Sequence, residues 1–268
     1  MIGTTKSLGQ KNTLDKFYTN PQVAQECLNL LNLNDYDLII EPSAGNGSFS
    51  NLIPNCLAMD IEPENDQILK KDFFLYTPTD VKNILVVGNP PFGQQSSLAI
   101  DFFNHAAKFA NTIAFILPKS FKKYSIQNKL NLYFYLEYEY NLSKNSFILN
   151  NKPYDVPCVF QIWIKKDQPR KKIILPTTSI YFDFTKNILE ADFRIQRVGG
   201  NAGTAFLDKN GALSSNYYLI NKTNIELNTL INLLNQIEYD SIADTVGPKS
   251  LPKGEMILKI EQKIREVN

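Results

Sequence analysis

The stretch Leu85-Val86-Val87-Gly88-Asn89-Pro90-Pro91-Phe92 predicts a buried strand that ends in a stiff turn. A short apolar run is typical of a buried strand, and neither proline can continue a sheet or lie inside a helix. Asn89 at the strand end offers an amide oxygen, Pro90 a carbonyl without an N–H, and Phe92 a flat ring. Two acceptors beside one ring suit a planar base that carries an exocyclic amine. The alternative is an ordinary strand and turn, with Phe92 in the core.

A glycine-rich turn, PSAGNGSF at residues 42–49, follows a short strand predicted at residues 38–41. Strand, turn and following helix are typical of the first crossing of a doubly wound α/β sheet, where ligands bind beyond the strand ends. Gly45 and Gly47 allow a tight turn and close approach to a ligand. The third glycine of the dinucleotide fingerprint is missing, and the carboxylate of Glu41 suits an ammonium group better than a pyrophosphate. A tight turn without a ligand is the alternative.

Acidic residues follow the next two predicted strand ends. The strand at residues 56–59 ends at Asp60, about twenty residues beyond the start of the glycine turn, where an acidic side chain can bind ribose hydroxyls. Asp72 can accept a hydrogen bond from an adenine amino group, and Phe73 can stack on that adenine. Solvated carboxylates at strand ends are the alternative.

A helix is predicted at residues 21–31, because Asn20 is a favourable N-cap and Pro21 suits the first helical position. Phe17 and Tyr18 precede the cap and are expected either to pack on this helix or, for Tyr18 and Thr19, to line a cofactor cleft. The segment before them, residues 1–16, is polar and is expected to be a flexible arm.

Further elements are expected along the first two thirds of the chain. A helix at residues 96–110 carries His105, which we expect to be a packing or surface residue, because no nucleophile or metal partner is suggested nearby. A loop of about a dozen residues around 146–153 is long enough to be functional. Strands are predicted at residues 112–117, 133–142 and 156–165.

The composition is that of a globular protein without an obvious membrane or metal role. The formal net charge of 268 residues is +1, so a nucleic-acid partner would need a local basic patch. No apolar run of about 18 residues and no apolar signal core occur, and three scattered cysteines with one histidine do not predict a zinc site. We expect a reduced, intracellular protein that is neither secreted nor membrane-bound.

A composition break at residues 167–172 predicts a boundary, with a catalytic domain at residues 17–167 and a C-terminal extension at residues 168–268. The extension is expected to be α+β and is a candidate for substrate recognition. Its predicted strands lie at residues 179–184, 193–198 and 217–220, and its helices at residues 224–237 and 255–267.

Taken in order, these motifs resemble the N6-adenine methyltransferases of the gamma arrangement. The resemblance rests on FYTNP at residues 17–21, EPSAGNG at residues 41–47, Asp60, Asp72 and NPPF at residues 89–92. It implies a Rossmann-like class I methyltransferase fold, an α/β fold whose seven-stranded, mostly parallel sheet has one reversed strand and binds S-adenosyl-L-methionine. It covers about residues 16–165, and no large target-recognition domain is recognised beyond them.

The resemblance also implies roles for individual residues. The expected catalytic group is Asn89, Pro90, Pro91 and Phe92, and Phe147 occupies the position of a second base-stacking aromatic. The expected cofactor-binding residues are Tyr18, Thr19, Glu41, Ser43, Ala44, Gly45, Asn46, Gly47, Asp60, Ile61, Asp72, Phe73 and Asn89.

The expected reaction is methyl transfer to the N6 amine of adenine in nucleic acid, with DNA as the first substrate class. Acceptors at Asn89 and Pro90 hold the two amine hydrogens, and no metal is required. Reaching the amine in a duplex requires base flipping, at a cost of a few kcal/mol that stacking on Phe92 partly offsets. The alternatives are an RNA adenosine-N6 methyltransferase, which avoids the flipping cost, and a non-catalytic nucleic-acid-binding subunit.

Two lysine-rich segments could contact phosphates. Lys119, Lys122 and Lys123 follow a predicted strand end on the same side of the sheet as Asn89, and are expected to position the nucleic acid. The second segment, residues 165–172, is equally well explained as a solvated charge run.

Overall fold

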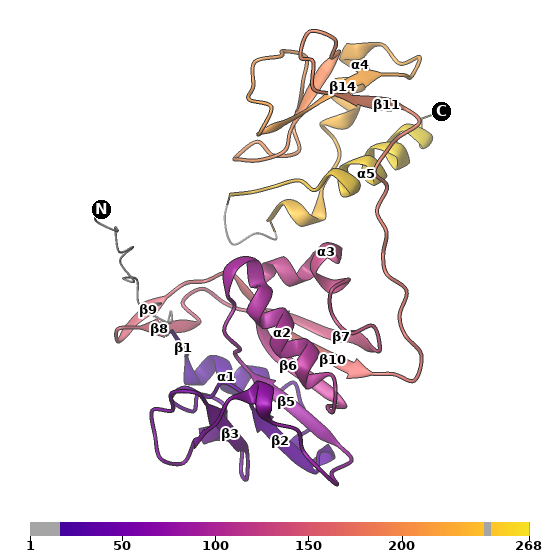
Figure 1. The fold of residues 1–268 in the computed structure, drawn as a ribbon. Coiled ribbons are helices and arrows are strands. Elements are labelled where there is room, and N and C mark those ends of the chain that lie inside the picture. The colour runs from indigo at the N-terminus through magenta and orange to yellow at the C-terminus, as the bar shows by residue number, and fades with distance from the viewer. Residues whose placement is uncertain (1–16, 244–247, 268) are drawn as a thin grey trace, which may run out of the picture.

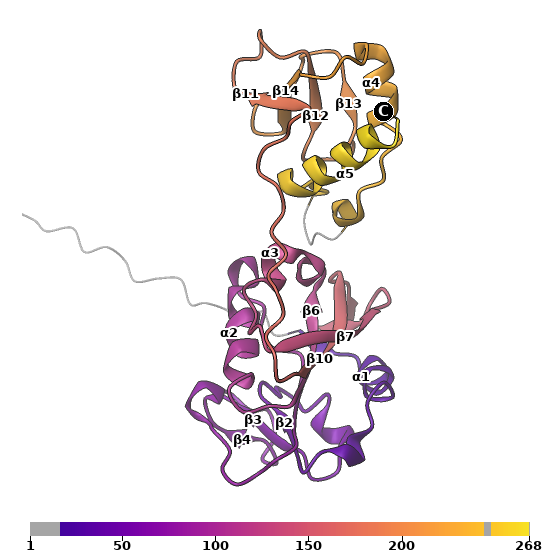
Figure 2. The same cartoon turned by 90° about the vertical axis from the view of Figure 1, so that its right-hand side faces the viewer.

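The computed structural model describes residues 17–243 and 248–267, and the predicted arm at residues 1–16 lies outside them. Figures 1 and 2 show two lobes joined by an extended segment, which leaves the first lobe after Lys165 and enters the second before Phe182. Within the described ranges, no helix is long and apolar enough to cross a lipid bilayer.

Seven strands of the described chain form the main sheet of the first lobe, in the order β4-β3-β2-β5-β6-β10-β7. The pairs β4–β3, β3–β2, β2–β5 and β5–β6 are parallel, whereas β10 is antiparallel to both of its neighbours. The predicted seven-stranded, mostly parallel sheet with one reversed strand is therefore confirmed. Its strands are β2 Leu38–Glu41, β3 Leu57–Asp60, β4 Leu69–Lys70, β5 Ile84–Gly88, β6 Thr112–Pro118, β7 Phe134–Asn141 and β10 Cys158–Lys165.

The strand order reverses at β2. From β2 the chain continues outward to β3 and β4 on one side, and then returns to place β5 on the other. The carboxyl ends of β2 and β5 are therefore neighbours at a topological switch point, where open α/β sheets bind their ligands.

The helices predicted at residues 21–31, 96–110 and 224–237 are shorter in the structure, whereas the helix predicted at residues 255–267 begins and ends two residues earlier. Asn20 caps α1 as expected, since its side chain accepts a hydrogen bond from the backbone N–H of Gln22 at 3.0 Å. The α-helices are α1 Pro21–Leu28, α2 Ser97–Ala106, α3 Tyr124–Gln127, α4 Leu227–Leu234 and α5 Lys253–Arg265. Short 3₁₀ turns lie at Leu33–Asp35, Ser50–Leu52, Phe73–Leu75, Gln94–Ser96, Lys119–Lys122 and Asp240–Ala243.

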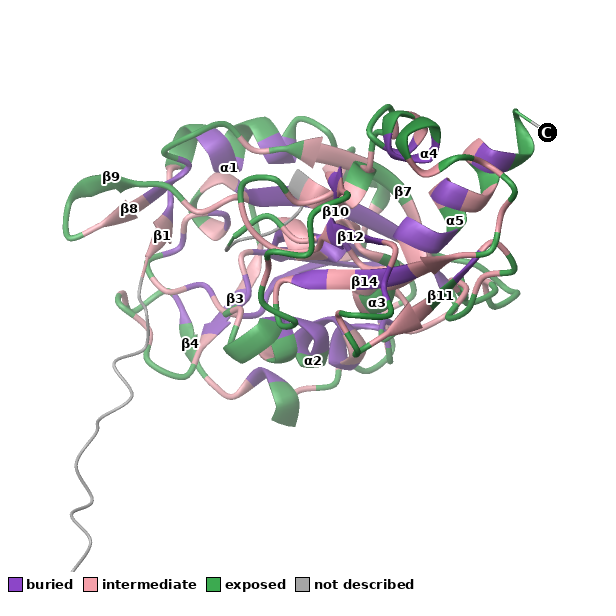
Figure 3. Ribbon diagram, turned by 90° about the horizontal axis from the view of Figure 1, so that it is seen from above, coloured by how far each residue is buried: buried purple, intermediate pink, exposed green. Residues whose placement is uncertain are grey.

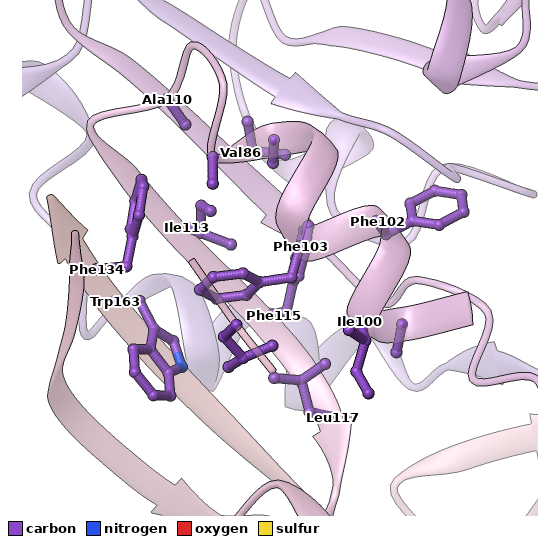
Figure 4. Packing of buried hydrophobic residues seen from close by; sticks show 14 of the residues in the cluster. Val86, Ile100, Phe102, Phe103, Ala110, Ile113, Phe115, Leu117, Phe134 and Trp163 are labelled. Atoms are coloured by element: carbon purple, nitrogen blue, oxygen red, sulfur yellow. The ribbon is translucent and has the colours of Figure 1, made fainter. Parts of the chain in front are cut away.

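Buried apolar residues cover both faces of the main sheet. Because side chains alternate along a strand, Val86 packs on the side of α2 and Val87 on the side of α1. Figure 4 shows the ring of Phe103 from α2 lying against the sheet near Phe134 and Trp163, with ring centroids 5.7 and 5.5 Å away. Burial on both faces explains the continuous apolar runs of β5 and β6.

Two predicted elements differ from the structure. No α-helix follows the glycine turn; the chain makes only the 3₁₀ turn Ser50–Leu52, and Pro54 prevents a longer helix by removing a backbone donor. The predicted loop around residues 146–153 is a hairpin of β8 Phe147–Leu149 and β9 Lys152–Tyr154. A short strand, β1 Tyr18–Thr19, pairs with β8.

The second lobe is an antiparallel sheet covered by helices, with order β11-β14-β12-β13 in its described residues. Its apolar cluster contains residues from Tyr181 onward, such as Phe193, Leu230 and Ile257, whereas the clusters of the first lobe extend no further than Ile164. Its strands are β11 Phe182–Thr185, β12 Phe193–Gln196, β13 Ala205–Phe206 and β14 Asn216–Asn221. Of these, β13 was not predicted.

Candidate active site

A cavity of about 1310 Å³ opens at the carboxyl ends of β2, β3 and β5. A pocket for one ligand is typically about 300–1,000 Å³, so this one has room for two adjoining ligands. Of the residues expected from the sequence, those that line it are Tyr18, Thr19, Glu41, Ser43, Ala44, Gly45, Asp60, Ile61, Asp72, Phe73, Asn89, Pro90, Pro91, Phe92 and Lys123. Asn46, Gly47, Lys119, Lys122 and Phe147 are not in its wall.

Asn89 follows the last residue of β5, Gly88, whose φ is +151°. A Cβ atom at Gly88 would lie 3.3 Å from Cγ of Glu41, so the two strand ends are packed as closely as glycine allows. The carbonyl oxygen of Asn89 accepts a hydrogen bond from the Ser43 hydroxyl at 3.3 Å. Its side-chain Oδ1 is buried, and no donor within the described residues reaches it. A buried acceptor without a donor costs about 1–3 kcal/mol, which a ligand N–H would relieve.

The glycine turn approaches the cavity through its backbone. Gly45 has φ of +54°, its N–H donates to Oδ2 of Asp60 at 2.8 Å, and its carbonyl accepts from the N–H of Glu64 at 3.1 Å. A Cβ atom on Gly45 would lie 3.2 Å from the Tyr18 ring. Gly47 is not in the cavity wall, and its φ of +87° allows the chain to complete the turn. The positive φ angles explain why glycine occupies both positions.

Asp60 is held rigidly by the backbone around it. Its Oδ2 accepts from Gly45, and its Oδ1 accepts from the N–H of Glu62 at 2.8 Å. A carboxylate has about four acceptor sites, so capacity for a ligand hydroxyl remains. The same pattern recurs at Asp72, whose Oδ1 accepts from the N–H of Phe74 at 2.9 Å.

Glu41 is buried beneath the glycine turn and anchors it. Its two carboxylate oxygens accept from the backbone N–H groups of Ser50 at 2.7 Å and Phe49 at 3.4 Å. Burial raises the pKa of Glu41 to about 7, against the opposing effect of these hydrogen bonds. The side chain expected to face a ligand ammonium thus also fixes the start of the 3₁₀ turn.

Residues of β1 form a second wall of the cavity. The Tyr18 hydroxyl donates to the carboxylate of Glu64, and burial, followed by this hydrogen bond, raises the pKa of Tyr18 to about 12. Thr19 is buried, and its hydroxyl oxygen has no hydrogen-bond partner in the described part of the chain. Tyr18 therefore contacts the glycine turn through its ring and Glu64 through its hydroxyl. Thr19 offers a buried hydroxyl oxygen that is available to a polar group of a ligand.

The aromatic residues are arranged differently from the sequence-based expectation. Phe147 is completely buried and packs edge-on against Phe17, with ring centroids 5.0 Å apart. Phe17 lines the cavity instead, 5.7 Å from the ring of Phe92. The structure therefore places Phe147 in the core behind the wall. The sequence predicts only a helix-packing role for Phe17, and its place at the start of the FYTNP segment is the signal that indicates a position at the site.

Phe73 lies deeper than a stacking residue would need to be. Only 1% of it is exposed, and its ring stacks on Phe102 with centroids 5.4 Å apart and an interplanar angle of 21°. His105 packs edge-on against Phe73, and its Nε2 lies 3.0 Å from the Tyr76 carbonyl oxygen. The predicted packing role of His105 is confirmed. In the residues described, no group of His, Cys, Asp and Glu side chains could hold a metal ion.

Of the three lysines that follow β6, Lys122 and Lys123 lie in different environments. Nζ of Lys122 lies 3.1 Å from Oε1 of Glu139, so its charge is balanced in an ion pair on the sheet. Lys123 lines the cavity and donates to the Ser250 hydroxyl of the second lobe at 3.5 Å. Of the predicted phosphate contacts, Lys123 is the one that the fold brings to the cavity.

Comparisons with known proteins give a likeness of fold. No family model matches the chain, and no curated protein matches its sequence. A solved structure of PH1948 from Pyrococcus horikoshii, a provisionally assigned RNA methyltransferase, has a TM-score of 0.45 and 17% identity, over 59% of this chain and 90% of that one. The 23S rRNA methyltransferase ErmE has a TM-score of 0.39 and 13% identity, over 57% of this chain and 71% of its own.

Proposed function

We propose that this chain is an S-adenosylmethionine-dependent methyltransferase that modifies the N6 amine of adenine in nucleic acid. The observation that carries the proposal is the buried, unpartnered Oδ1 of Asn89 in the wall of a large cavity, next to Pro90 and Phe92. An amide oxygen in that position is ready to accept one hydrogen of an exocyclic amine.

The cavity residues fit the cofactor by their chemistry. Gly45 lets the turn approach the Tyr18 ring so closely that a Cβ atom would crowd it, and Thr19 has an unpartnered buried hydroxyl oxygen for a polar group. We assign the methionine part to Thr19 and residues 43–45, and the ribose to Asp60. Asp72 is assigned to the adenine amino group of the cofactor. When bound, S-adenosylmethionine supplies an electrophilic methyl group.

The residues of the NPPF segment hold the accepting base. Oδ1 of Asn89 and the carbonyl oxygen of Pro90 accept the two amine hydrogens, which draws electron density back to the nitrogen and fixes its position. Phe92 supports the base by stacking, worth about 1–3 kcal/mol for a base on an aromatic ring. Because these contacts involve the base alone, the proposal covers adenine in DNA, the class expected from the sequence, and in RNA, the alternative.

The test is Asn89→Ala, assayed for transfer of a labelled methyl group to adenine-containing RNA, single-stranded DNA and duplex DNA. We expect the rate to fall by about 10²–10³-fold, the effect of removing one preorganised hydrogen-bonding group. Cofactor affinity, measured by calorimetry, should remain near that of the wild type.

Asn83→Ala is the matched control, because Asn83 is an exposed asparagine at the opposite end of β5. It should transfer methyl groups at the wild-type rate. Wild-type protein that methylates none of the three substrates would overturn the proposal, and so would an Asn89→Ala variant with undiminished activity.

A further inference from the structure

The β8–β9 hairpin shares a face with the cavity wall. In the three-stranded sheet β1-β8-β9, Thr19 is paired with Phe147, and Phe147 with Tyr154, so these three side chains lie in one row on one face. Leu149 pairs with Lys152, and side chains two residues apart point to the same face. Lys152 therefore projects to the same face as Tyr154 and the cavity-lining Thr19.

Aromatic rings connect the cavity to the hairpin edge. Phe92 and Phe17 line the cavity with centroids 5.7 Å apart, and the ring of Phe17 lies 6.0 Å from that of Tyr154 at an interplanar angle of 43°. Tyr154 is outside the cavity and 41% exposed. The wall against which a base would stack thus continues outward onto an exposed aromatic surface.

The hairpin edge also carries positive charge. Lys152 is exposed on β9, the outer strand of its small sheet, and Figure 3 shows β9 in the colour of exposed residues at the end of the molecule. Lysine and proline on an edge strand also prevent unwanted pairing with other chains, which accounts for Lys152 and Pro153. Edge protection does not account for an exposed tyrosine ring in contact with the cavity wall.

We propose that the hairpin is a subsite for the nucleotide next to the target base, with Tyr154 stacking on its base and Lys152 binding its phosphate. The inference rests on the proposed function, which it deepens by specifying an unpaired strand. In a duplex the neighbouring base is covered on both faces by its own stack, whereas in a single strand it can stack on an aromatic side chain.

The first test is Tyr154→Ala, with binding of labelled single-stranded adenine homopolymers, in RNA and in DNA form, measured by fluorescence anisotropy. We expect the affinity for the single strands to fall by roughly 5- to 150-fold, the range for losing one base–aromatic stack. Tyr154→Phe should restore it, because it keeps the ring. Comparison of the affinities for the two homopolymers shows whether the subsite binds RNA or DNA.

Two controls separate a stacking role from a general loss of structure. Tyr133→Ala removes a similarly exposed ring, 45% accessible, elsewhere on the first lobe and should leave binding unchanged. Cofactor affinity of Tyr154→Ala should also be unchanged, whereas its KM for the single strand should rise and its kcat be retained.

The second test is Lys152→Ala, titrated at several salt concentrations. Losing one phosphate contact on a single strand should lower the log–log salt slope by about 0.7. The subsite is overturned if wild-type protein methylates the single strand while Tyr154→Ala binds it equally well, or if Tyr154→Ala affects a duplex as strongly. If the wild type binds no nucleic acid, the proposed function and the subsite both fail.

Discussion

Asn89 and Thr19 each carry a buried side-chain oxygen that no donor within the described residues satisfies. Most buried polar groups in folded proteins have a hydrogen-bond partner, so two exceptions in one cavity wall call for an explanation. We explain them as acceptor positions for ligand hydrogens, because both atoms belong to residues that line the same cavity.

The raised pKa of Glu41 predicts how the free energy of unfolding depends on pH. Its folded-state pKa of about 7 is above its ordinary value of 4.5, because burial favours the neutral acid. Between these two pH values the unfolded chain loses the proton while the folded chain keeps it, so stability falls as pH rises through this window. The loss is on the order of 3 kcal/mol, at 1.36 kcal/mol for each pKa unit.

Glu41→Gln should remove this dependence, because an amide cannot ionise but can still accept from the Ser50 N–H. In urea titrations from below pH 4.5 to above pH 7, the free energy of unfolding of the variant should rise relative to that of the wild type. Glu238→Gln, at an exposed carboxylate, is the control. A constant difference between Glu41→Gln and wild type across the window would contradict the assignment.

At the scale of elements, the β8–β9 hairpin depends on its two turn residues. Asn150 and Asn151 have φ angles of +50° and +59°, as a two-residue type I′ turn requires. Asparagine tolerates this region better than other side chains, and glycine better still. The Asn-Asn pair was the available signal that the predicted loop is a hairpin.

Asn151→Gly should therefore stabilise the hairpin, and Asn151→Ala should destabilise it by about 1 kcal/mol, because an alanine side chain in this conformation is strained. Hydrogen exchange followed by mass spectrometry should show slower exchange of the β8–β9 amides in the glycine variant and roughly fivefold faster exchange in the alanine variant. Amides of α2, remote from the turn, provide the internal control. Equal exchange in both variants would show that the turn does not limit hairpin opening.

At the scale of the whole molecule, the linker is attached to the first lobe at Arg170 and again at Ile173, whose backbone N–H donates to the Asn128 side chain and whose carbonyl oxygen accepts from it. Arg170 donates to the carbonyl oxygens of Phe134 at 2.9 Å and Gln127, and its guanidinium lies over the Trp163 ring. Beyond it, Lys171 and Lys172 are exposed, and 88% of Ile174 is accessible. The apolar clusters lie entirely on one side or the other of this segment.

We therefore propose that the two lobes are separate folding units, as the sequence boundary suggests, and that brief trypsin treatment cuts after Lys171 or Lys172. The expected products are two protease-resistant fragments that meet at this site, identified by mass spectrometry. Replacing both lysines with glutamine should leave the chain intact under the same conditions. Loss of both lobes at equal rates, without a stable fragment, would mean that they fold as one unit.

The parts of the fold that the sequence by itself determined are those fixed by local backbone chemistry. Pro90 and Pro91 in succession end the strand, Gly45 permits a positive φ, and the apolar run of β5 is typical of a strand buried on both faces. These constraints predicted a doubly wound α/β sheet with a turn beyond its strand ends. The seven-stranded sheet with one reversed strand and most of the site residues were expected from the resemblance of the motifs to the gamma-type N6-adenine methyltransferases.

What only the tertiary structure decided is which side chains of those motifs face the cavity and which face the core. Phe17 and Phe147 are equally apolar, yet the fold leaves Phe17 in the cavity wall and encloses Phe147 completely, in edge-on contact with Phe17. Glu41 is buried because the 3₁₀ turn folds back over β2 and supplies its hydrogen-bond donors. Such choices depend on contacts between residues distant in sequence, whose free energies no local pattern contains.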